Sequence, residues 1–521
     1  MKGRIKNILG RRSTLLKAAI FATGFSGVVA EYILSTLATY FLGDSIFQWV
    51  MIISLMLFSM GVGSRISKVF NQHLLKWFLI VEFALSLLVS FAPLSVYTMS
   101  AWSTSYETLI YVLSIGIGML IGMEVPLVVR INNEFEELKY NISGILENDY
   151  YGSLLGGVFF AFIGLPVLGL MYTPFVLGLV NLLVAIALII SLRKVMSDSD
   201  KKLLLPSASA ILVILVAGLL VTKPVILYGE QSKYKDKVVY TKQTAYQRIV
   251  MTQWKDDYWL YLNGNQQLST RDEVMYHEPL VHPALTLHPH PENILILGGG
   301  DGCAAREILK YPSVKNITLV DLDPAMTALG QNNPILTELN HNSLNNEKVN
   351  IINTDGYQFI QNDTSFYDAI FIDLPDPRTV ELGRLYSYEF YKSCYKLLRP
   401  QGVIVTQAGS PYFATKAFLC IGKTMKEAGF TTVPLHNQVV TMGEWGWSLG
   451  QKASPYQDLK NTLQKLQFSV DTQWIDHEAM QLITSFGKDI YVGDNKGPVK
   501  VNRIHDPVLY KYYLKGNWDL Y

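Results

Sequence analysis

Residues 294–323 read ILILGGGDGCAAREILKYPSVKNITLVDLD, and this stretch predicts the fold of the second half of the chain. An apolar run enters three glycines, a helix-forming segment follows, and residues 317–320 are apolar and partly β-branched. A strand, a glycine-rich turn, a helix and a strand in this order form the nucleotide-binding βαβ unit. Asp321 stands about twenty residues after the glycines, where an acid holds ribose hydroxyls. The more informative residue is Asp301, because an acid among the glycines is not part of the general pattern.

The composition of the whole chain points to two different parts. Half of the 521 residues are hydrophobic, and the excess lies before about residue 222. The net charge is +1, so nothing suggests nucleic acid as a partner. The three cysteines, Cys303, Cys394 and Cys420, are far apart, and we expect neither a disulfide framework nor a cysteine-based metal site.

Residues 1–222 are predicted to be a polytopic transmembrane domain of about seven helices, in contact with the lipid bilayer of the cell (inner) membrane. A helix crosses a hydrocarbon core of about 30 Å with about 20 apolar residues. The runs that reach this length cover residues 15–41, 46–64, 76–98, 107–129, 149–170, 173–192 and 203–222. The first is too long, and the set too numerous, for a cleavable signal peptide.

The basic residues predict the orientation of this domain. They are Lys2, Arg4, Lys6, Arg11 and Arg12 before the first run, and Arg65, Lys68, Lys76, Arg130, Lys139, Arg193, Lys194, Lys201 and Lys202 in every second loop. The alternate loops, near 43–44, 100–108 and 171–173, carry no Lys or Arg, which places the N-terminus in the cytoplasm. An odd number of crossings puts the second half of the chain outside. A re-entrant run or an eighth crossing puts it inside, and the sequence leaves this open.

Four acids lie in or at the edge of the apolar runs: Glu31, Glu82, Glu124 and Asp149. Ionisable groups in lipid are costly and often functional. One interpretation is a path for cations or polyamines. The other is that these acids are interfacial or pair within the helix bundle.

Residues 223–285 are predicted to form a linker and a small β domain with a substrate helix. Alternating residues at 248–262 predict a β-hairpin that turns at Lys255-Asp256-Asp257, and residues 272–285 are typical of a helix. His277 and His282 are five residues apart, unlike the HExxH metal motif, so we expect no metal.

Residues 286–521 are predicted to form a Rossmann-type α/β domain. Strands are expected at 294–297, 317–320, 349–353, 367–372 and 403–407. Four of them lead into an acid: Asp301, Asp321, Asp355 and Asp373. Because ligands in open α/β sheets bind at the carboxyl ends of the strands, we expect these acids to share one pocket.

A set of motifs in residues 240–450 resembles the spermidine synthase family of polyamine aminopropyltransferases. The motifs are YQ at 246–247, NGNQQLSTRDEVMYHE at 263–278, LGGGDG at 297–302, VDLD at 320–323, TDG at 354–356, DLPDP at 373–377 and VTQ at 405–407. The first half looks like the multi-span domain attached to some bacterial members. The resemblance implies an AdoMet-methyltransferase-like sheet after a small β domain, and a homodimer or homotetramer.

The resemblance also implies the reaction. An aminopropyl group passes from decarboxylated S-adenosylmethionine to a diamine, commonly putrescine, and gives spermidine and methylthioadenosine. The chemistry of Asp301 agrees with this donor, because an acid would repel the carboxylate of ordinary AdoMet but can pair with a lone ammonium. The sulfonium is already activated, so neither a permanently bound cofactor nor a metal is expected.

Roles for individual residues follow from the resemblance. Asp373 would be the base and Tyr276 would orient the attacking nitrogen, while Asp376 and His277 would hold the amine. The methylthioadenosine part would be held by Gln247, Asp321, Asp355 and Gly356. Gln267 and Gln407 are further expected contacts.

The chain departs from the family pattern at several positions, among them Asn263, Cys303 and Val380. The donor site looks intact, whereas the acceptor site and its lid differ. A second interpretation is therefore a polyamine transporter or sensor, whose soluble half binds nucleotide or amine. A third, an AdoMet methyltransferase, is disfavoured by Asp301.

Overall fold

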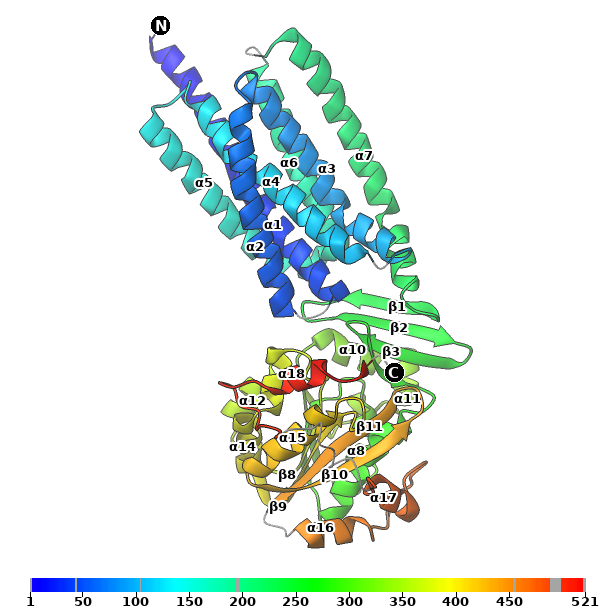
Figure 1. Ribbon diagram of the computed structural model, residues 1–521. Coiled ribbons are helices and arrows are strands. Elements are labelled where there is room, and N and C mark those ends of the chain that lie inside the picture. The colour runs from blue at the N-terminus through cyan, green and yellow to red at the C-terminus, as the bar shows by residue number, and fades with distance from the viewer. Residues whose placement is uncertain are drawn as a thin grey trace. The chain divides into compact units, whose positions relative to one another are not determined.

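The computed structural model describes residues 2–42, 45–103, 105–193, 196–452, 456–487 and 498–518. The chain divides into two compact units, one helical and one α/β (Figure 1). The first comprises Met1–Val238 and Gln243–Ala245, and the second comprises Val239–Lys242 and Tyr246–Tyr521. The loop at Gly43-Asp44, Lys194 and the side chains of Lys2, Arg4, Lys6 and Arg11 lie outside the described residues.

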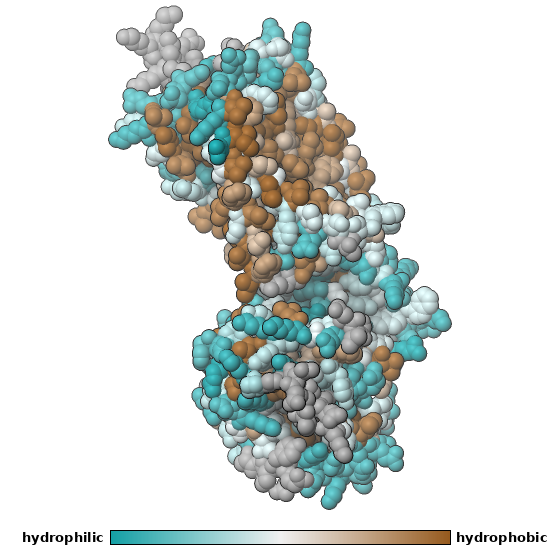
Figure 2. Space-filling view, viewed as in Figure 1, coloured by the Kyte–Doolittle hydropathy of each residue, from teal (hydrophilic) through white to brown (hydrophobic). Residues whose placement is uncertain are grey.

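The first unit is a bundle of long, mostly apolar helices. They are α1 (Lys2–Leu42), α2 (Ser45–Ile66), α3 (Leu74–Ser100), α4 (Tyr106–Asn132), α5 (Leu138–Phe159), the π-helical segment η2 (Phe160–Leu168), α6 (Gly169–Leu192) and α7 (Asp198–Gln231). Apolar side chains also cover the outside of this unit (Figure 2), and Phe58, Phe162 and Leu220 are 71%, 75% and 75% exposed. Helix α7 continues past residue 222, where the sequence predicted its end.

Six helical segments of the described chain are long and apolar enough to cross a membrane, and the predicted count of about seven crossings stays a prediction. They are Arg12–Leu42, Ile46–Val69, Leu74–Ser100, Tyr106–Asn132, Leu138–Leu192 and Asp198–Gln231. The difference arises because the runs 149–170 and 173–192 lie in one uninterrupted helical segment.

That segment is not straight. The hydroxyl of Thr173 donates a hydrogen bond of 2.7 Å to the carbonyl of Gly164, nine residues earlier. In a straight α-helix nine residues advance about 13 Å. Gly169, with a φ of 64°, lies between the two. The chain therefore bends sharply at η2, and α5 and α6 are separate helices.

Close helix contacts in the bundle depend on glycine. Helices α2 and α4 approach so closely that a Cβ on Gly122 would lie 2.0 Å from the carbonyl oxygen of Met60. A Cβ on Gly116, in the same helix, would meet nothing within 4 Å. Small residues commonly allow such close backbone packing in apolar helix bundles.

Two β-sheets form the rest of the fold, with strand orders β1-β2-β3-β4 and β10-β11-β9-β8-β5-β6-β7. The first contains β1 (Lys237–Gln243), β2 (Arg248–Trp254), β3 (Asp257–Leu262) and β4 (Asn265–Ser269). The second contains β5 (Asn293–Gly298), β6 (Asn316–Asp321), β7 (Val349–Asn353), β8 (Tyr367–Asp373), β9 (Leu398–Gly409), β10 (Phe430–Val439) and β11 (Gly443–Lys452). Strands β5 to β9 pair in parallel, and β10 and β11 are antiparallel.

Helices cover the larger sheet. They are α8 (Val274–Leu287), α9 (Cys303–Leu309), α10 (Pro324–Asn332), α11 (Pro334–Leu339), α12 (Gly356–Asn362), α13 (Val380–Gly383), α14 (Tyr388–Leu397), α15 (Thr415–Glu427), α16 (Tyr456–Leu463), α17 (His477–Ile483) and α18 (Leu509–Leu514). Along β5, Ile294 and Ile296 belong to one apolar cluster, and Leu295 and Leu297 to another. Both faces of the sheet are thus buried, as is typical of parallel sheets.

The predicted Rossmann-type architecture of this part is confirmed. The hairpin of β2 and β3, the helix α8 and all five expected strands are present, with ends shifted by a few residues. The antiparallel pair β10–β11 was not expected. It pairs Phe430–Val439 with Gly443–Lys452 across a short turn.

We predict that Gly122→Ala destabilises the helical unit, because the added Cβ must push α2 and α4 apart. Overpacking of this kind costs about 1–3 kcal/mol. Thermal unfolding of the full-length protein in detergent, followed by circular dichroism, should show a melting temperature several degrees below wild type. Gly116→Ala is the control and should leave it unchanged or raise it. Equal melting temperatures for the two variants would contradict the packing argument.

Candidate active site

The centre of the larger sheet brings a glycine loop and an acid together. From β5 the chain continues to β6 and β7 on one side, and β8 and β9 lie on the other, so β5 and β8 flank the point where the connections diverge. Ligands bind at such a point. Gly298 is in register with Asp373, and a Cβ on Gly298 would lie 2.0 Å from the carbonyl oxygen of Asp373. Only glycine permits this contact, and its φ of 86° also favours glycine.

Asp373 ends β8 in a buried position surrounded by polar groups. The hydroxyl of Tyr276 donates a hydrogen bond of 2.7 Å to its Oδ1, and His277 Nε2 lies 4.0 Å from its Oδ2. Burial, together with the charge of Asp301, raises the pKa of Asp373 to about 6, while His277 and Tyr276 oppose the rise. A carboxylate with a pKa near the working pH is suited to accept a proton.

Asp301 lies near the same nitrogen of His277 as Asp373 does. Its Oδ1 accepts a hydrogen bond of 2.8 Å from the backbone N–H of Cys303 and lies 3.9 Å from His277 Nε2. One side-chain atom each of His277, Asp301 and Asp373 lies within 4.8 Å of the others. Two carboxylates this close form a site for a cation, and an ammonium fits as well as a metal ion does. The expectation that no metal is used stays a prediction.

His277 is held by a second layer of charged groups. Its Nδ1 lies 2.7 Å from Glu273 Oε2, and Arg306 donates two hydrogen bonds to Glu273, of 2.7 and 3.0 Å. Burial lowers the pKa of His277, but the hydrogen bond and the charge of Glu273 outweigh it and raise the pKa to about 9. Sequence reasoning missed Glu273 and Arg306. The four-residue spacing of Glu273 and His277 on one helix was the available signal.

Asp376 forms a second carboxylate near Asp373. Its Oδ2 accepts a hydrogen bond of 2.6 Å from the hydroxyl of Tyr513 and lies 3.6 Å from Arg378, while its Oδ1 accepts a hydrogen bond of 3.4 Å from Gln407. Burial raises its pKa. Tyr276 lies within electrostatic range of both Asp373 and Asp376. Tyr513 lies in α18, far from any motif, and nothing in the sequence pointed to it.

The residues expected at the nucleoside line the ends of β6 and β7. Asp321 Oδ1 accepts a hydrogen bond of 2.8 Å from the N–H of Asp323, and burial raises the pKa of Asp321 to about 6. Gln247 donates 2.9 Å to Asp323 Oδ2. Asp355 caps α12, whose first residue is Gly356, by accepting from the N–H of Gln358.

Asp355 also forms an ion pair with Arg384, a residue that the sequence did not single out. Gln267 Nε2 donates to the carbonyls of Asn265 and Gln266, at 3.2 Å each. No hydrogen bond among the described residues joins Gln267 to Asp301 or Asp373, and its part in the site stays a prediction.

The departures from the family pattern have local explanations. Cys303 is fully buried and packs with Ile249 and Met251 of the small sheet. Asn263 adopts a φ of 50° in the turn after β3, and its Oδ1 accepts from the N–H of Arg248. Val380 begins α13, which the side chain of Thr379 caps.

A parallel sheet with a glycine loop and acids at its carboxyl edge defines a Rossmann-type enzyme. The spermine/spermidine synthase domain family matches residues 273–461. A polyamine aminopropyltransferase of Leptospira interrogans is 37% identical over 504 residues, which are 96% of this chain and 98% of that protein. Polyamine aminopropyltransferase 2 of Aquifex aeolicus is 40% identical over 504 residues, 96% and 99% of the two chains. The crystal structure of spermidine synthase from Thermotoga maritima is 25% identical, covers 48% of this chain and 85% of its own, and has a TM-score of 0.44.

The chain belongs to the polyamine aminopropyltransferase family, and the protein is an aminopropyltransferase. The two bacterial relatives match both halves of the chain, so the helical half is part of what they share. A methyltransferase is excluded by this membership, and so is a transporter or sensor without enzymatic activity.

We predict that the charge of His277 makes stability depend on pH. Its pKa is about 9 in the folded protein and 6.5 ordinarily, so its proton stabilises the fold fully below pH 6.5. This stabilisation, at most about 3 kcal/mol, is lost as the pH rises through 9. Urea unfolding of full-length protein should therefore show a lower midpoint at pH 9.5 than at pH 6.5. His277→Asn should have a much smaller difference, and the same difference in both proteins would overturn the assignment.

Proposed function

We propose that the protein transfers the aminopropyl group of decarboxylated S-adenosylmethionine to putrescine, giving spermidine and methylthioadenosine. The observation that carries this proposal is the grouping of Asp373, Tyr276, His277 and Asp301 at the centre of the sheet edge. The group offers a carboxylate for the donor's ammonium and a second carboxylate, of near-neutral pKa, for the acceptor.

The reaction needs an uncharged amine in line with the carbon that leaves sulfur. The nitrogen lone pair forms the new C–N bond, the C–S bond breaks, and its electron pair returns to sulfur, which becomes neutral. The nitrogen must lose a proton, and Asp373 accepts it. The hydrogen bond from Tyr276 fixes the orientation of this carboxylate.

Asp301 holds the ammonium of the donor, and Asp321, Asp355, Gly356 and Gln247 hold its nucleoside. The chemistry requires no metal and no permanently bound cofactor, because the sulfonium is already a good leaving group.

In this proposal Asp376 binds the distal ammonium of a diamine, and His277 lies near the attacking nitrogen. Hydrogen bonds from Tyr513 and Gln407 fix the carboxylate, and Arg378 lies 3.6 Å from it. The acceptor site has a carboxylate at each end, Asp373 and Asp376. It therefore favours a substrate with two amines over one with a single amine.

The helical unit is proposed to span the cell membrane, with the N-terminus in the cytoplasm. The six apolar segments, their exposed apolar side chains and the basic residues of alternate loops support this. Protease accessibility of the second unit on intact cells distinguishes an odd from an even number of crossings. With the N-terminus in the cytoplasm, an odd number exposes the second unit to external protease, and an even number protects it. A homodimer or homotetramer is proposed from the family resemblance and is measured by light scattering in detergent.

We predict that Asp373→Asn lowers kcat at least a hundredfold, because an amide cannot accept the proton of the amine and general-base catalysis contributes about 10²–10⁴-fold. Methylthioadenosine release from decarboxylated S-adenosylmethionine and putrescine measures the rate. Asp256→Asn, in the exposed turn between β2 and β3, is the control and should retain full activity. Full activity of Asp373→Asn would show that another group is the base.

We predict that Asp376→Asn raises KM for putrescine about tenfold or more and changes kcat less, because a charge-assisted contact to the distal ammonium is lost. Butylamine, which has one amine, should be insensitive to this substitution. In wild type, kcat/KM should be higher for putrescine than for cadaverine, agmatine or spermidine. If another amine has the highest kcat/KM, that amine and not putrescine is the acceptor, and the assignment as an aminopropyltransferase is unaffected.

A further inference from the structure

The helical unit contains buried carboxylates that the transfer reaction does not use. Glu82 of α3 and Glu124 of α4 are 0% and 2% exposed. Both oxygens of Glu82 and one of Glu124 have no hydrogen-bond partner. Neither residue takes part in an ion pair with any Lys, Arg or His of the described chain. In this they differ from Glu136 of the same unit, which pairs with Lys17 at 2.8 Å.

These carboxylates belong to one cluster. Glu124 lies within electrostatic range of Glu82 and Asp149 and within hydrogen-bonding reach of the hydroxyl of Thr23. Asp149 packs against α1 at Gly24, where a Cβ would lie 2.7 Å from its Oδ1. Four helices, α1, α3, α4 and α5, thus each contribute a polar residue to one region of the core.

A hollow of about 190 Å³, too narrow in this packing for a water-sized sphere, adjoins the cluster and is lined by oxygens without partners. It is lined by Thr23, Ser26, Gly27, Ala30, Leu85, Val89, Ile121 and Asn181. The Oγ of Ser26 and the Oδ1 of Asn181 are buried and have no hydrogen-bond partner. Leu85 and Ile121 lie three residues from Glu82 and Glu124, and this spacing puts them on the same helix faces as the acids.

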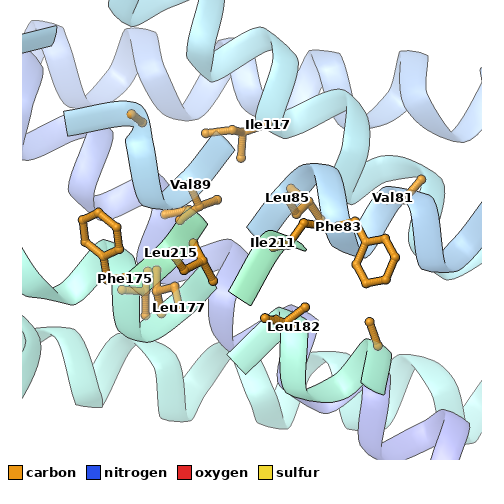
Figure 3. Close-up of a cluster of buried hydrophobic side chains, with 14 of the residues drawn as sticks. Val81, Phe83, Leu85, Val89, Ile117, Phe175, Leu177, Leu182, Ile211 and Leu215 are labelled. Carbon is orange, nitrogen blue, oxygen red and sulfur yellow. The ribbon is translucent and has the colours of Figure 1, made fainter. Parts of the chain in front are cut away.

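The surroundings of the cluster are apolar. Figure 3 shows Val81, Phe83 and Leu85 on the helix that carries Glu82, with Leu182 on the helix that carries Asn181. A buried carboxylate without a partner is strongly unfavourable, and buried charges in proteins are normally paired or bind ions. Carboxylate, hydroxyl and amide oxygens are the ligands that hard cations and ammonium groups prefer.

We propose that Glu82 and Glu124, with the oxygens of Ser26 and Asn181, form a binding site for a monovalent cation inside the helical unit. The cation is either an alkali ion or the ammonium end of an amine. These share the chemistry of a compact positive charge that accepts several oxygen ligands. The site lies in the first unit and is distinct from the Asp301–Asp373 cluster of the second, so it does not rest on the proposed acceptor.

The test uses full-length protein purified in detergent, with ²²Na⁺ and radiolabelled putrescine as separate probes. Scintillation proximity measures saturable binding to wild type, Glu82→Gln and Glu124→Gln. Glu107→Gln, exposed in the first turn of α4, is the matched control. Methylthioadenosine release by each variant is measured in parallel, because the site in the second unit also binds amines.

An alkali site predicts saturable ²²Na⁺ binding that weakens at least tenfold in Glu82→Gln and Glu124→Gln but not in Glu107→Gln. An amine site predicts two putrescine molecules per wild-type chain and one in the same two variants. In either case aminopropyl transfer should stay within twofold of wild type. If wild type binds the cation but shows no aminopropyl transfer to putrescine, the result counts against the proposed function and not against the cation site.

The proposal is overturned if wild type binds neither ²²Na⁺ nor a second putrescine, because the carboxylates are then buried in their neutral, protonated form. It is also overturned if both Gln variants bind as wild type does. Should a Gln variant fail to fold, Asn181→Ala and Ser26→Ala keep both carboxylates and remove one oxygen ligand each. They should weaken binding several-fold, and unchanged binding in both would equally overturn the site.

Discussion

The second unit is organised around the balance of charge at one buried cluster. Asp373 and Asp301 both lie near Nε2 of His277, Glu273 contacts its Nδ1, and Arg306 pairs with Glu273. Negative and positive groups alternate along this series, so no member is left as an isolated buried charge. Removing one partner from such a series typically costs several kcal/mol. The backbone must therefore hold three separate segments, around Glu273, Asp301 and Asp373, within about 4 Å of His277.

The fold meets this requirement through a few close contacts. Gly298 allows the glycine loop to lie against the carbonyl of Asp373, which fixes β5 beside β8. Helix α8 carries Tyr276 and His277, and Glu273 directly precedes it. The ring of Tyr276 packs against that of Trp447 in β11, with 5.3 Å between the ring centroids. The unexpected strand β11 thus supports the residue that contacts the proposed base. The hydrogen bonds of the active site depend on packing that extends across the sheet.

The two units treat buried acids in opposite ways. In the α/β unit, Glu273 and Glu307 are buried, and hydrogen bonds with His277, Arg306 and His282 satisfy them. In the helical unit, Glu82 and Glu124 are equally buried and keep oxygens without partners. The first arrangement is complete in itself and rigid, whereas the second leaves ligand atoms available. This contrast is the physical reason for proposing that the helical unit binds a cation and is not purely structural.

The local patterns of the sequence determined the elements and the main site residues. The apolar runs predicted the helical unit, the strand–glycine–helix order predicted the βαβ unit, and Asp301 and Asp373 were expected at the same edge of a parallel sheet. Tyr276 and Asp373 are 97 positions apart in the sequence. Their joint role was expected from the resemblance to a family, and no local pattern predicted it.

Only the tertiary structure decided which groups complete these sites. Tyr513 and Arg384 reach Asp376 and Asp355 from segments without a motif, and Arg306, which lies in the βαβ stretch, pairs with Glu273 of another segment. The same holds for Asn181 and Glu82, which lie on different helices. The bend at η2, which separates α5 from α6, also depends on a contact between Thr173 and Gly164 that hydropathy does not encode. Composition and periodicity predict the secondary structure of each segment. The partner of a charged side chain depends on tertiary packing, because the two residues lie far apart in the sequence.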